Sequence, residues 1–392
     1  MKKTVAFFLL ILCGSLVYAQ SGSSIPPGQI LVDTHNDFLS KSVEQNLSFD
    51  SNLKGKTHSD LNRMFAGGVN VQIFSIFCDD HYGKGSAFAY ANREIDSLYA
   101  VAGRNPGKIK IVSTPAELLQ AVKQHKLAAM MGVEGGHMIE DDLNKLDSFY
   151  KRGVRYMTLT WNNSTSWATS ARDESAHAFI ATPYGLTSFG KQIVKRMNEM
   201  GMMIDISHVG EQTFWDVIHI TSKPVIASHS SVYALCPVFR NLKDDQIKAI
   251  AKNGGVIQVN FYSGFLDSSY EKKLKAFMNL HKSEFDSLNA KKLPEYSIQM
   301  FFSTKYHQEV QALRPPLSLL IDHIDYIVKL VGADYVGLGS DFDGIESAPK
   351  ELNGVEDYPK ITQALLKRGY NKKDIQKILG GNLIRAFKEN SK

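Results

Sequence analysis

Short apolar runs alternate with amphipathic segments eight times along this chain, and this alternation constrains its fold more than any other feature. Most of the runs are nearly continuous in apolar residues, as strands buried on both faces of a sheet are. They predict strands over residues 30–35, 69–77, 127–134, 154–161, 202–208, 224–229, 255–261 and 335–341. Helices are predicted over residues 86–102, 142–151, 186–200, 212–220, 244–252 and 318–331, with two more near 359–367 and 372–388.

Eight strand–helix units in succession predict an α/β fold, a single (β/α)8 TIM-like barrel that forms one domain over residues 30–392. An open, doubly wound sheet is the alternative, but it normally carries a glycine-rich phosphate loop after its first strand. Here the first predicted strand ends in Asp33-Thr-His-Asn-Asp37 instead. The longest insertion, residues 262–316, is charged and aromatic and has no strand pattern. We therefore predict a helical insertion before the last strand, over one end of the barrel.

Composition and the N-terminal sequence indicate an exported globular protein. The chain of 392 residues is 43% hydrophobic and 22% charged, which excludes disordered and fibrous classes. A charged start, a short apolar run and a cleavage pattern near Ala19 predict a signal peptide over 1–19, followed by a linker over 20–29. The run is too short to favour a membrane anchor, so we expect a soluble mature chain that is periplasmic or secreted. The formal charge of +5 falls to +3 without Lys2 and Lys3, too little to indicate nucleic-acid binding.

Polar side chains with metal-binding chemistry stand where five of the predicted strands end. In a barrel of this kind the carboxyl ends of the strands converge on one axis. The six side chains are His35, Asp37, Glu134, His208, His229 and Asp341. Any one of them alone is more often a helix cap or a hydrogen-bonded loop residue than a ligand. Three carboxylates in one place would be costly unless cations neutralised them, so together they indicate a metal centre.

The number of these groups favours two metal ions over one. Three histidines and three carboxylates are too many for a single tetrahedral zinc with an open position, but they suit two ions bridged by a carboxylate and a hydroxide. His35 and Asp37 are two residues apart in an extended strand and share a face, and Glu134 comes from a strand between the two sets. Mixed imidazole and carboxylate ligation favours Zn2+, with Mn2+ or Co2+ as alternatives. We therefore predict two Zn2+ per chain, with Glu134 as the bridge.

Five ordered motifs resemble those of the membrane dipeptidase (renal dipeptidase) family, and the resemblance runs from about Leu31 to Phe387. The motifs are Asp33-Thr-His-Asn-Asp37, Gly132-Val-Glu-Gly-Gly136, Asp205-Ile-Ser-His208, Ser228-His-Ser-Ser231 and Gly339-Ser-Asp-Phe-Asp-Gly344. The resemblance implies a binuclear-zinc barrel that hydrolyses dipeptides, a metallo-dipeptidase. It further implies that one zinc is held by His35, Asp37 and Asp341, the other by His208 and His229, and both by Glu134.

The same resemblance gives Arg240 a role and Trp161 an exception. An arbitrary arginine is more often part of a surface ion pair, but here the resemblance implies that Arg240 binds the C-terminal carboxylate of a dipeptide through its planar fork. The family has a histidine after Thr158-Leu-Thr160, on the side of the scissile carbonyl, where this chain has Trp161. An indole N–H donates a hydrogen bond but does not titrate. We therefore include Arg240 and Trp161 as substrate-binding candidates.

Two further departures concern the chain end and the cysteines. Family members from animals end in a hydrophobic tail that is exchanged for a lipid anchor; this chain ends in Lys388-Glu-Asn-Ser-Lys392, so we expect no such anchor. With Cys13 in the predicted signal peptide, Cys78 and Cys236 remain, and they pair only if the fold brings them together.

The expected reaction is hydrolysis of a dipeptide by a hydroxide that bridges the two metal ions. Asp341 would accept the proton of the water and pass it to the leaving amine, with Glu134 as the second catalytic residue. One alternative is another binuclear amidohydrolase-type hydrolase; these commonly use a carbamylated lysine at the end of the fourth strand, where this chain has Thr158-Leu-Thr-Trp161. The other is an exported zinc- or peptide-binding barrel with impaired catalysis. The sequence leaves open the dipeptide preference and whether the chain is a monomer or a homodimer.

Overall fold

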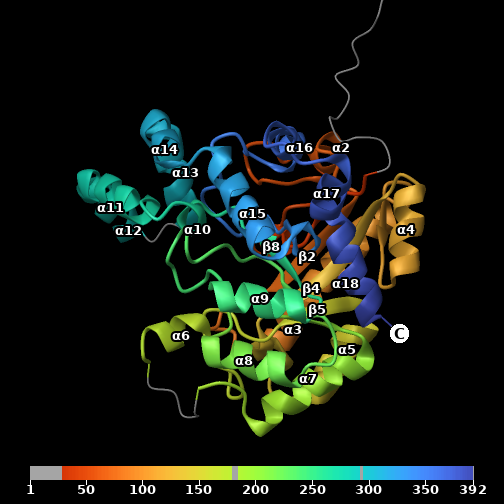
Figure 1. Cartoon of the computed structure of the whole chain (residues 1–392). Coiled ribbons are helices and arrows are strands. Elements are labelled where there is room, and N and C mark those ends of the chain that lie inside the picture. Colours follow the sequence, from red (N-terminus) through yellow and green to blue (C-terminus); the bar gives the residue numbers. More distant parts are fainter. Residues whose placement is uncertain (1–28, 179–183, 292–294, 392) are drawn as a thin grey trace, which may run out of the picture.

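Eight parallel strands form a nearly closed ring with helices around it (Figure 1). The computed structural model describes residues 29–178, 184–291 and 295–391. The strands in this part of the chain are β1 Val32–Asp33, β2 Val71–Phe77, β3 Ile109–Ile111, β4 Leu127–Glu134, β5 Val154–Thr158, β6 Met203–Asp205, β7 Ile226–Ala227, β8 Val256–Val259 and β9 Val336–Leu338. Neighbours follow the order β1-β2-β4-β5-β6-β7-β8-β9, and β3 pairs with β4 outside this path.

Backbone hydrogen bonds between the first and last strands close the ring. The N–H of Thr34 donates to the carbonyl of Leu338 at 3.2 Å, and that of Asp37 donates to Phe342 at 3.0 Å. An open doubly wound sheet would leave these two edges far apart. The predicted (β/α)8 barrel is therefore confirmed, and the open sheet is excluded.

The helices follow the predicted pattern with a few additions. The helices outside the insertion are α1 Phe38–Gln45, α2 Leu61–Ala66, α3 Ala87–Arg104, α4 Pro115–Lys123, α5 Leu143–Lys151, α6 Ala171–Ser175, α7 Ser188–Met200, α8 Glu211–Ile220, α9 Asp244–Lys252, α15 Leu317–Val331, α16 Tyr358–Lys367, α17 Lys372–Gln376 and α18 Asn382–Asn390. Local sequence sets several of their ends: α4 begins in a capping box of Thr114 and Glu117, and Gly201 caps α7 in the left-handed region at φ 83°.

One predicted helix is two in the structure. A single helix was expected near 372–388, but a π-helical turn, Lys377–Gly381, separates α17 from α18. A Cβ added at Gly380 would lie 2.5 Å from Val32 Cγ2 and 2.6 Å from the carbonyl oxygen of Ile30. The chain therefore passes directly against β1 at this point, and the close approach interrupts the helix.

The predicted insertion is a helical arm that projects from the barrel (Figure 1). Its helices are α10 Ser263–Leu266, α11 Tyr270–Leu280, α12 Lys282–Ala290, α13 Glu295–Lys305 and α14 His307–Leu313. Phe277, Ile298 and Phe302 form a small apolar cluster that is separate from the core of the barrel. The arm thus has a core of its own.

The barrel interior is filled at the end opposite the polar strand ends. Val71 and Ile73 of β2 belong to one buried cluster, whereas Phe74 and Ile76 belong to another, because side chains alternate between the two faces of a strand. Phe387 of α18 belongs to the same cluster as Val71 and Ile73, so the C-terminal helix covers the amino-terminal end of the barrel. The opposite end remains for polar loops.

The predicted signal peptide 1–19, with Cys13, and all of the predicted linker except residue 29 lie outside the described residues. None of the described helices combines the length and apolarity needed to cross a bilayer.

Within the described chain Cys78 and Cys236 are buried and free; Cys78 lies 3.6 Å from His137 Nε2, and Cys236 donates to the carbonyl of Gly264. The fold does not bring the two cysteines together.

Candidate active site

The six side chains predicted as ligands come together at the carboxyl ends of the strands, and Glu134 lies in the middle of them. Glu134 Oε1 is 2.9 Å from His208 Nε2 and 3.3 Å from His229 Nε2. Its other oxygen, Oε2, is 3.3 Å from His35 Nε2. Each oxygen of this buried carboxylate therefore faces a different group of ligand atoms, as a bridging ligand would.

Asp37 and Asp341 complete the cluster on the side of His35. One candidate ligand atom from each of these three residues lies within 4.8 Å of the others, and His35, Glu134 and His229 form a second such group. Asn260 Nδ2 donates to Asp341 Oδ2 at 2.8 Å and orients that carboxylate. Among the described residues the buried Oδ1 of Asp37 has no hydrogen-bond partner. A carboxylate oxygen without a donor in a buried site is suited to a cation.

Glu134 is the last residue of β4, the other ligand positions lie just beyond their strands, and two of these have backbone conformations that side chains rarely adopt. His35 and His229 follow the last residue of their strands by two positions, and His208 and Asp341 follow by three. His208 has φ 64° and Asp341 has φ 62°, both in the left-handed region. Such strain is characteristic of functional sites, where the surrounding structure maintains it.

Each of the three imidazoles has a polar partner at Nδ1, which leaves Nε2 directed at the centre. The partner atoms are Tyr156 Oη at 2.8 Å for His35, Asn162 Oδ1 at 3.2 Å for His208 and Ser228 Oγ at 2.8 Å for His229. The Nε2 atoms of His208 and His229 lie only 2.9 Å apart. Two nitrogen lone pairs this close need a cation or a proton between them. Histidines that bind a metal through one nitrogen almost always donate from the other, so this donor set fits metal ions.

Burial opposes the charged form of every group in the cluster, and neighbouring charges decide the outcome. Burial raises the pKa of Asp37 and of Asp341 and, with the nearby Arg240, lowers the pKa of His208 to about 4. For Glu134, the neighbouring imidazoles outweigh burial and hold its pKa well below the usual range. For His35, the carboxylates of Glu134 and Asp37 outweigh burial and raise its pKa to about 10. Protons and metal ions would therefore compete for the same atoms.

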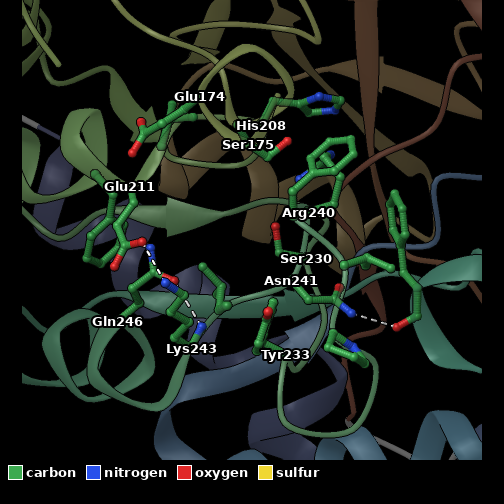
Figure 2. A pocket seen from close by; sticks show the side chains of 18 of the residues that line it. Glu174, Ser175, His208, Glu211, Ser230, Tyr233, Arg240, Asn241, Lys243 and Gln246 are labelled. Atoms are coloured by element: carbon green, nitrogen blue, oxygen red, sulfur yellow. Dashed lines mark hydrogen bonds and ion pairs between the residues drawn. The ribbon is translucent and has the colours of Figure 1, made fainter. Parts of the chain in front are cut away.

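A pocket of about 880 Å³ opens beside this cluster, and His208 and Arg240 both line it (Figure 2). Arg240 is 5% exposed, and its Nη2 donates to the carbonyl of His229 at 3.3 Å. Its buried Nε has no hydrogen-bond partner and its guanidinium forms no ion pair among the described residues. Burial lowers its pKa to about 10, so the guanidinium is still charged at neutral pH. It is a free, buried cation at the edge of a cavity.

Trp161 also lies near the cluster, at a position that packing explains in part. It follows β5 by three residues and is half-buried, with its ring centroid 4.9 Å from that of Phe77. The centroid of the His208 ring is 6.5 Å away. The indole therefore stands beside a predicted ligand, but it is not part of the pocket wall that contains Arg240.

No role was predicted from the sequence for the residues that hydrogen-bond the predicted ligands or the partners of those ligands, although Asp205 and Ser228 lie within the family motifs. These residues are Tyr156, Asn162, Asp205, Ser228 and Asn260. Two of them had a usable signal: Tyr156 and Asp205 are polar side chains in strands whose residues are all buried. A polar residue inside a buried strand must be satisfied by a specific partner, and this requirement could have identified both.

Comparisons with known proteins place the chain in one family. A family model described as membrane dipeptidase, peptidase family M19, matches residues 23–392. Dipeptidase 3 of Mus musculus is 33% identical over 363 residues, and that of Homo sapiens is 31% identical over 363 residues; each alignment covers 92% of this chain. The chain spans only 64% of the length of these relatives.

Solved structures share the fold. The probable dipeptidase PvdM from Pseudomonas aeruginosa has a TM-score of 0.73 at 25% identity, covering 93% of this chain and 96% of that one. A metallopeptidase from Rhodobacter sphaeroides, liganded with a phosphinate mimic of the dipeptide L-Ala-D-Ala, has a TM-score of 0.74 at 23% identity, covering 92% and 99%.

Proposed function

The chain belongs to the membrane dipeptidase family, peptidase family M19, and from that membership we propose that it hydrolyses the peptide bond of dipeptides with the help of bound metal ions. One observation carries the proposal. Three imidazole Nε2 atoms and three carboxylates converge beside a pocket that contains a buried, unpaired guanidinium. The imidazoles and carboxylates are suited to binding cations, and the guanidinium is suited to binding the free carboxylate of a short peptide.

We assign the metal ligands as the family resemblance implies. His35, Asp37 and Asp341 would hold one ion, His208 and His229 would hold the other, and Glu134 would be shared by both. Imidazole and carboxylate ligands without thiolates favour zinc, and six protein ligands favour two ions per chain. Two such ions would polarise the substrate carbonyl and lower the pKa of a water molecule.

The protein's own groups handle the substrate and the proton. Arg240 binds the C-terminal carboxylate of the dipeptide, and a longer peptide would present a neutral amide there and leave the guanidinium unpaired. Leaving a buried charge without its partner costs several kcal/mol, which excludes longer peptides. Asp341, oriented by Asn260 and with its pKa raised by burial, accepts a proton from the attacking water and passes it to the leaving amine.

The substrate-length argument is tested by comparing a dipeptide with its C-terminal amide. Wild type should prefer the free dipeptide in kcat/KM by orders of magnitude, and Arg240→Ala should reduce that ratio while keeping its metal content. Arg196→Ala is the control. This arginine lies away from the site and forms an ion pair with Asp147 at 2.7 Å. An unchanged ratio in Arg240→Ala would show that Arg240 is not the carboxylate anchor.

Trp161 supports a second candidate function, a zinc- or peptide-binding barrel with impaired catalysis, because it replaces the histidine expected beside the scissile carbonyl. A binuclear hydrolase that uses a carbamylated lysine is disfavoured, since β5 ends at Thr158 and is followed by Leu-Thr-Trp161, without a lysine. The two remaining candidates differ in turnover. The dipeptidase hydrolyses a panel of simple dipeptides, loses activity to a chelator and recovers it with zinc. The impaired barrel binds zinc and dipeptides without turnover, and Trp161→His should then restore hydrolysis.

A further inference from the structure

A buried aspartate that takes no part in the proposed chemistry sits directly behind one of the predicted ligands. Asp205, the last residue of β6, is inaccessible to solvent and accepts four hydrogen bonds. Its Oδ1 accepts from the backbone N–H groups of Ser207 at 3.0 Å and Ser228 at 2.8 Å. Its Oδ2 accepts from Ser228 Oγ at 2.6 Å and Thr158 Oγ1 at 2.5 Å. A carboxylate only accepts, so the single hydroxyl proton of Ser228 points at Asp205.

The direction of that bond fixes the next one in the chain. Ser228 Oγ also lies 2.8 Å from His229 Nδ1. Because the serine has already given its proton to Asp205, its oxygen accepts, and Nδ1 of His229 carries the hydrogen. Nε2, 3.3 Å from Glu134 Oε1, then carries the lone pair that a metal ion would take. We propose that Asp205 is a positioning residue that acts through Ser228 to hold His229 in the tautomer that binds metal.

The same architecture occurs a second time without the imidazole, which offers a matched control. Asp33 accepts from the N–H of Ser340 at 2.8 Å and from Ser340 Oγ at 2.7 Å, and Ser340 also precedes a predicted ligand, Asp341. The other contacts of Ser340 Oγ are with backbone groups, the carbonyl of His35 at 3.2 Å and the N–H of Phe342 at 3.1 Å. Removing this hydroxyl disturbs a buried Asp–Ser pair but no ligand tautomer.

Asp205→Asn separates the proposed role from a merely structural one. The two backbone donors keep the amide oxygen of the new side chain at the Oδ1 position, which places its NH2 group against Ser228 Oγ. The serine then accepts from the amide and donates to His229 Nδ1, so the imidazole hydrogen moves to Nε2 and blocks the metal-binding lone pair. Without the hydroxyl, as in Ser228→Ala, this reversal cannot be transmitted. The harm done by Asp205→Asn should therefore depend on Ser228.

The experiment measures zinc affinity by competition with a chromophoric chelator, starting from metal-free full-length protein. Asp205→Asn should weaken one of the two sites by about 10–100-fold, the range found for outer-shell partners of metal ligands. The double variant with Ser228→Ala should bind as Ser228→Ala does, and Ser340→Ala should bind as wild type does. Nitrogen-15 NMR of the metal-free protein supplies a readout independent of metal, with the His229 hydrogen on Nδ1 in wild type and on Nε2 in Asp205→Asn.

The inference rests on the proposed metal site, and the outcomes distinguish the two. Wild type that binds no zinc overturns the proposed function and this inference together. Wild type that binds two zinc ions while Asp205→Asn keeps both affinities overturns the inference alone. Losses that add in the double variant, or a His229 tautomer that is the same in wild type and Asp205→Asn, also overturn it, since a structural role predicts both.

Discussion

Glu134 occupies the centre of the predicted metal centre because β4 ends there, between the strands that carry the histidines. Its two oxygens contact different imidazoles, at 2.9 Å for His208 and 3.3 Å for His35. A neutral amide keeps the shape of this side chain but replaces one acceptor with a donor that cannot bind a cation. A single substitution at Glu134 therefore tests the ligand assignment sharply.

If the proposed function is right, Glu134→Gln should lose at least one zinc ion and the dipeptidase activity together. Elemental analysis of the purified variant gives the zinc count per chain. Glu94→Gln is the matched control, since Glu94 is also fully buried and burial raises its pKa well above the usual range, so a neutral side chain suits that position. Full zinc occupancy in Glu134→Gln would contradict the bridging role.

His35 leads to a prediction about pH. Its pKa is raised to about 10, so in the metal-free protein the imidazole keeps its extra proton throughout the neutral range. In that protein the raised pKa contributes stability that is fully present below about pH 6.5 and is lost as the pH rises through about 10. A metal ion at Nε2 must displace the proton, so zinc binding at pH 7 should release it. Calorimetry in buffers of different ionisation enthalpy measures this release, and a binding heat independent of the buffer would contradict the prediction.

For the strands and helices, the alternation of apolar runs was enough to predict the barrel, its eight strands and the polar strand ends. It was not enough to place the strand boundaries. The strands predicted over 154–161 and 202–208 stop pairing with their neighbours at Thr158 and Asp205. The last residues of each apolar run leave the sheet and direct side chains at the predicted metal centre. Strand β3 was missed because it is three residues long and lies outside the barrel. Tertiary contacts, which no local pattern records, decide all of these features.

The turn after β9 lies against the carboxylates of Asp37 and Asp341. A Cβ added at Gly344 would lie 2.2 Å from Asp37 Oδ2 and 2.7 Å from Asp341 Oδ1. Gly344→Ala should therefore displace both carboxylates and lower zinc affinity and activity. Gly107→Ala serves as the control, since a Cβ there meets nothing within 4 Å. Equal zinc affinity for Gly344→Ala and wild type would show that the turn tolerates a side chain and that the ligands are less tightly placed than the structure indicates.

For the whole molecule, the barrel separates stability at one end from chemistry at the other. The C-terminal helix α18 covers the amino-terminal end, where Phe387 is fully buried. The ligands lie at the opposite end, at the last residue of β4 or on the loops that follow the other strands. The two ends should respond independently to substitution.

Phe387→Ala should lower the free energy of unfolding by about 3–5 kcal/mol, the usual cost of truncating a buried phenylalanine. The kcat/KM for a dipeptide should be unchanged at temperatures where the variant is folded. Chemical denaturation and steady-state kinetics measure the two quantities, with the exposed neighbour Lys388→Ala as the control. A large loss of activity in the folded variant would show that the two ends are coupled.

The proposed function is the hydrolysis of dipeptides with two metal ions bound at the strand ends. The most direct test adds zinc stepwise to chelator-treated, metal-free protein and follows the hydrolysis of a simple dipeptide. Activity should be absent without metal and should rise to a plateau at about two zinc ions per chain, as expected for a two-metal site. Hydrolysis that persists in the metal-free protein, or a plateau already reached at one ion per chain, would contradict the proposed two-metal hydrolysis.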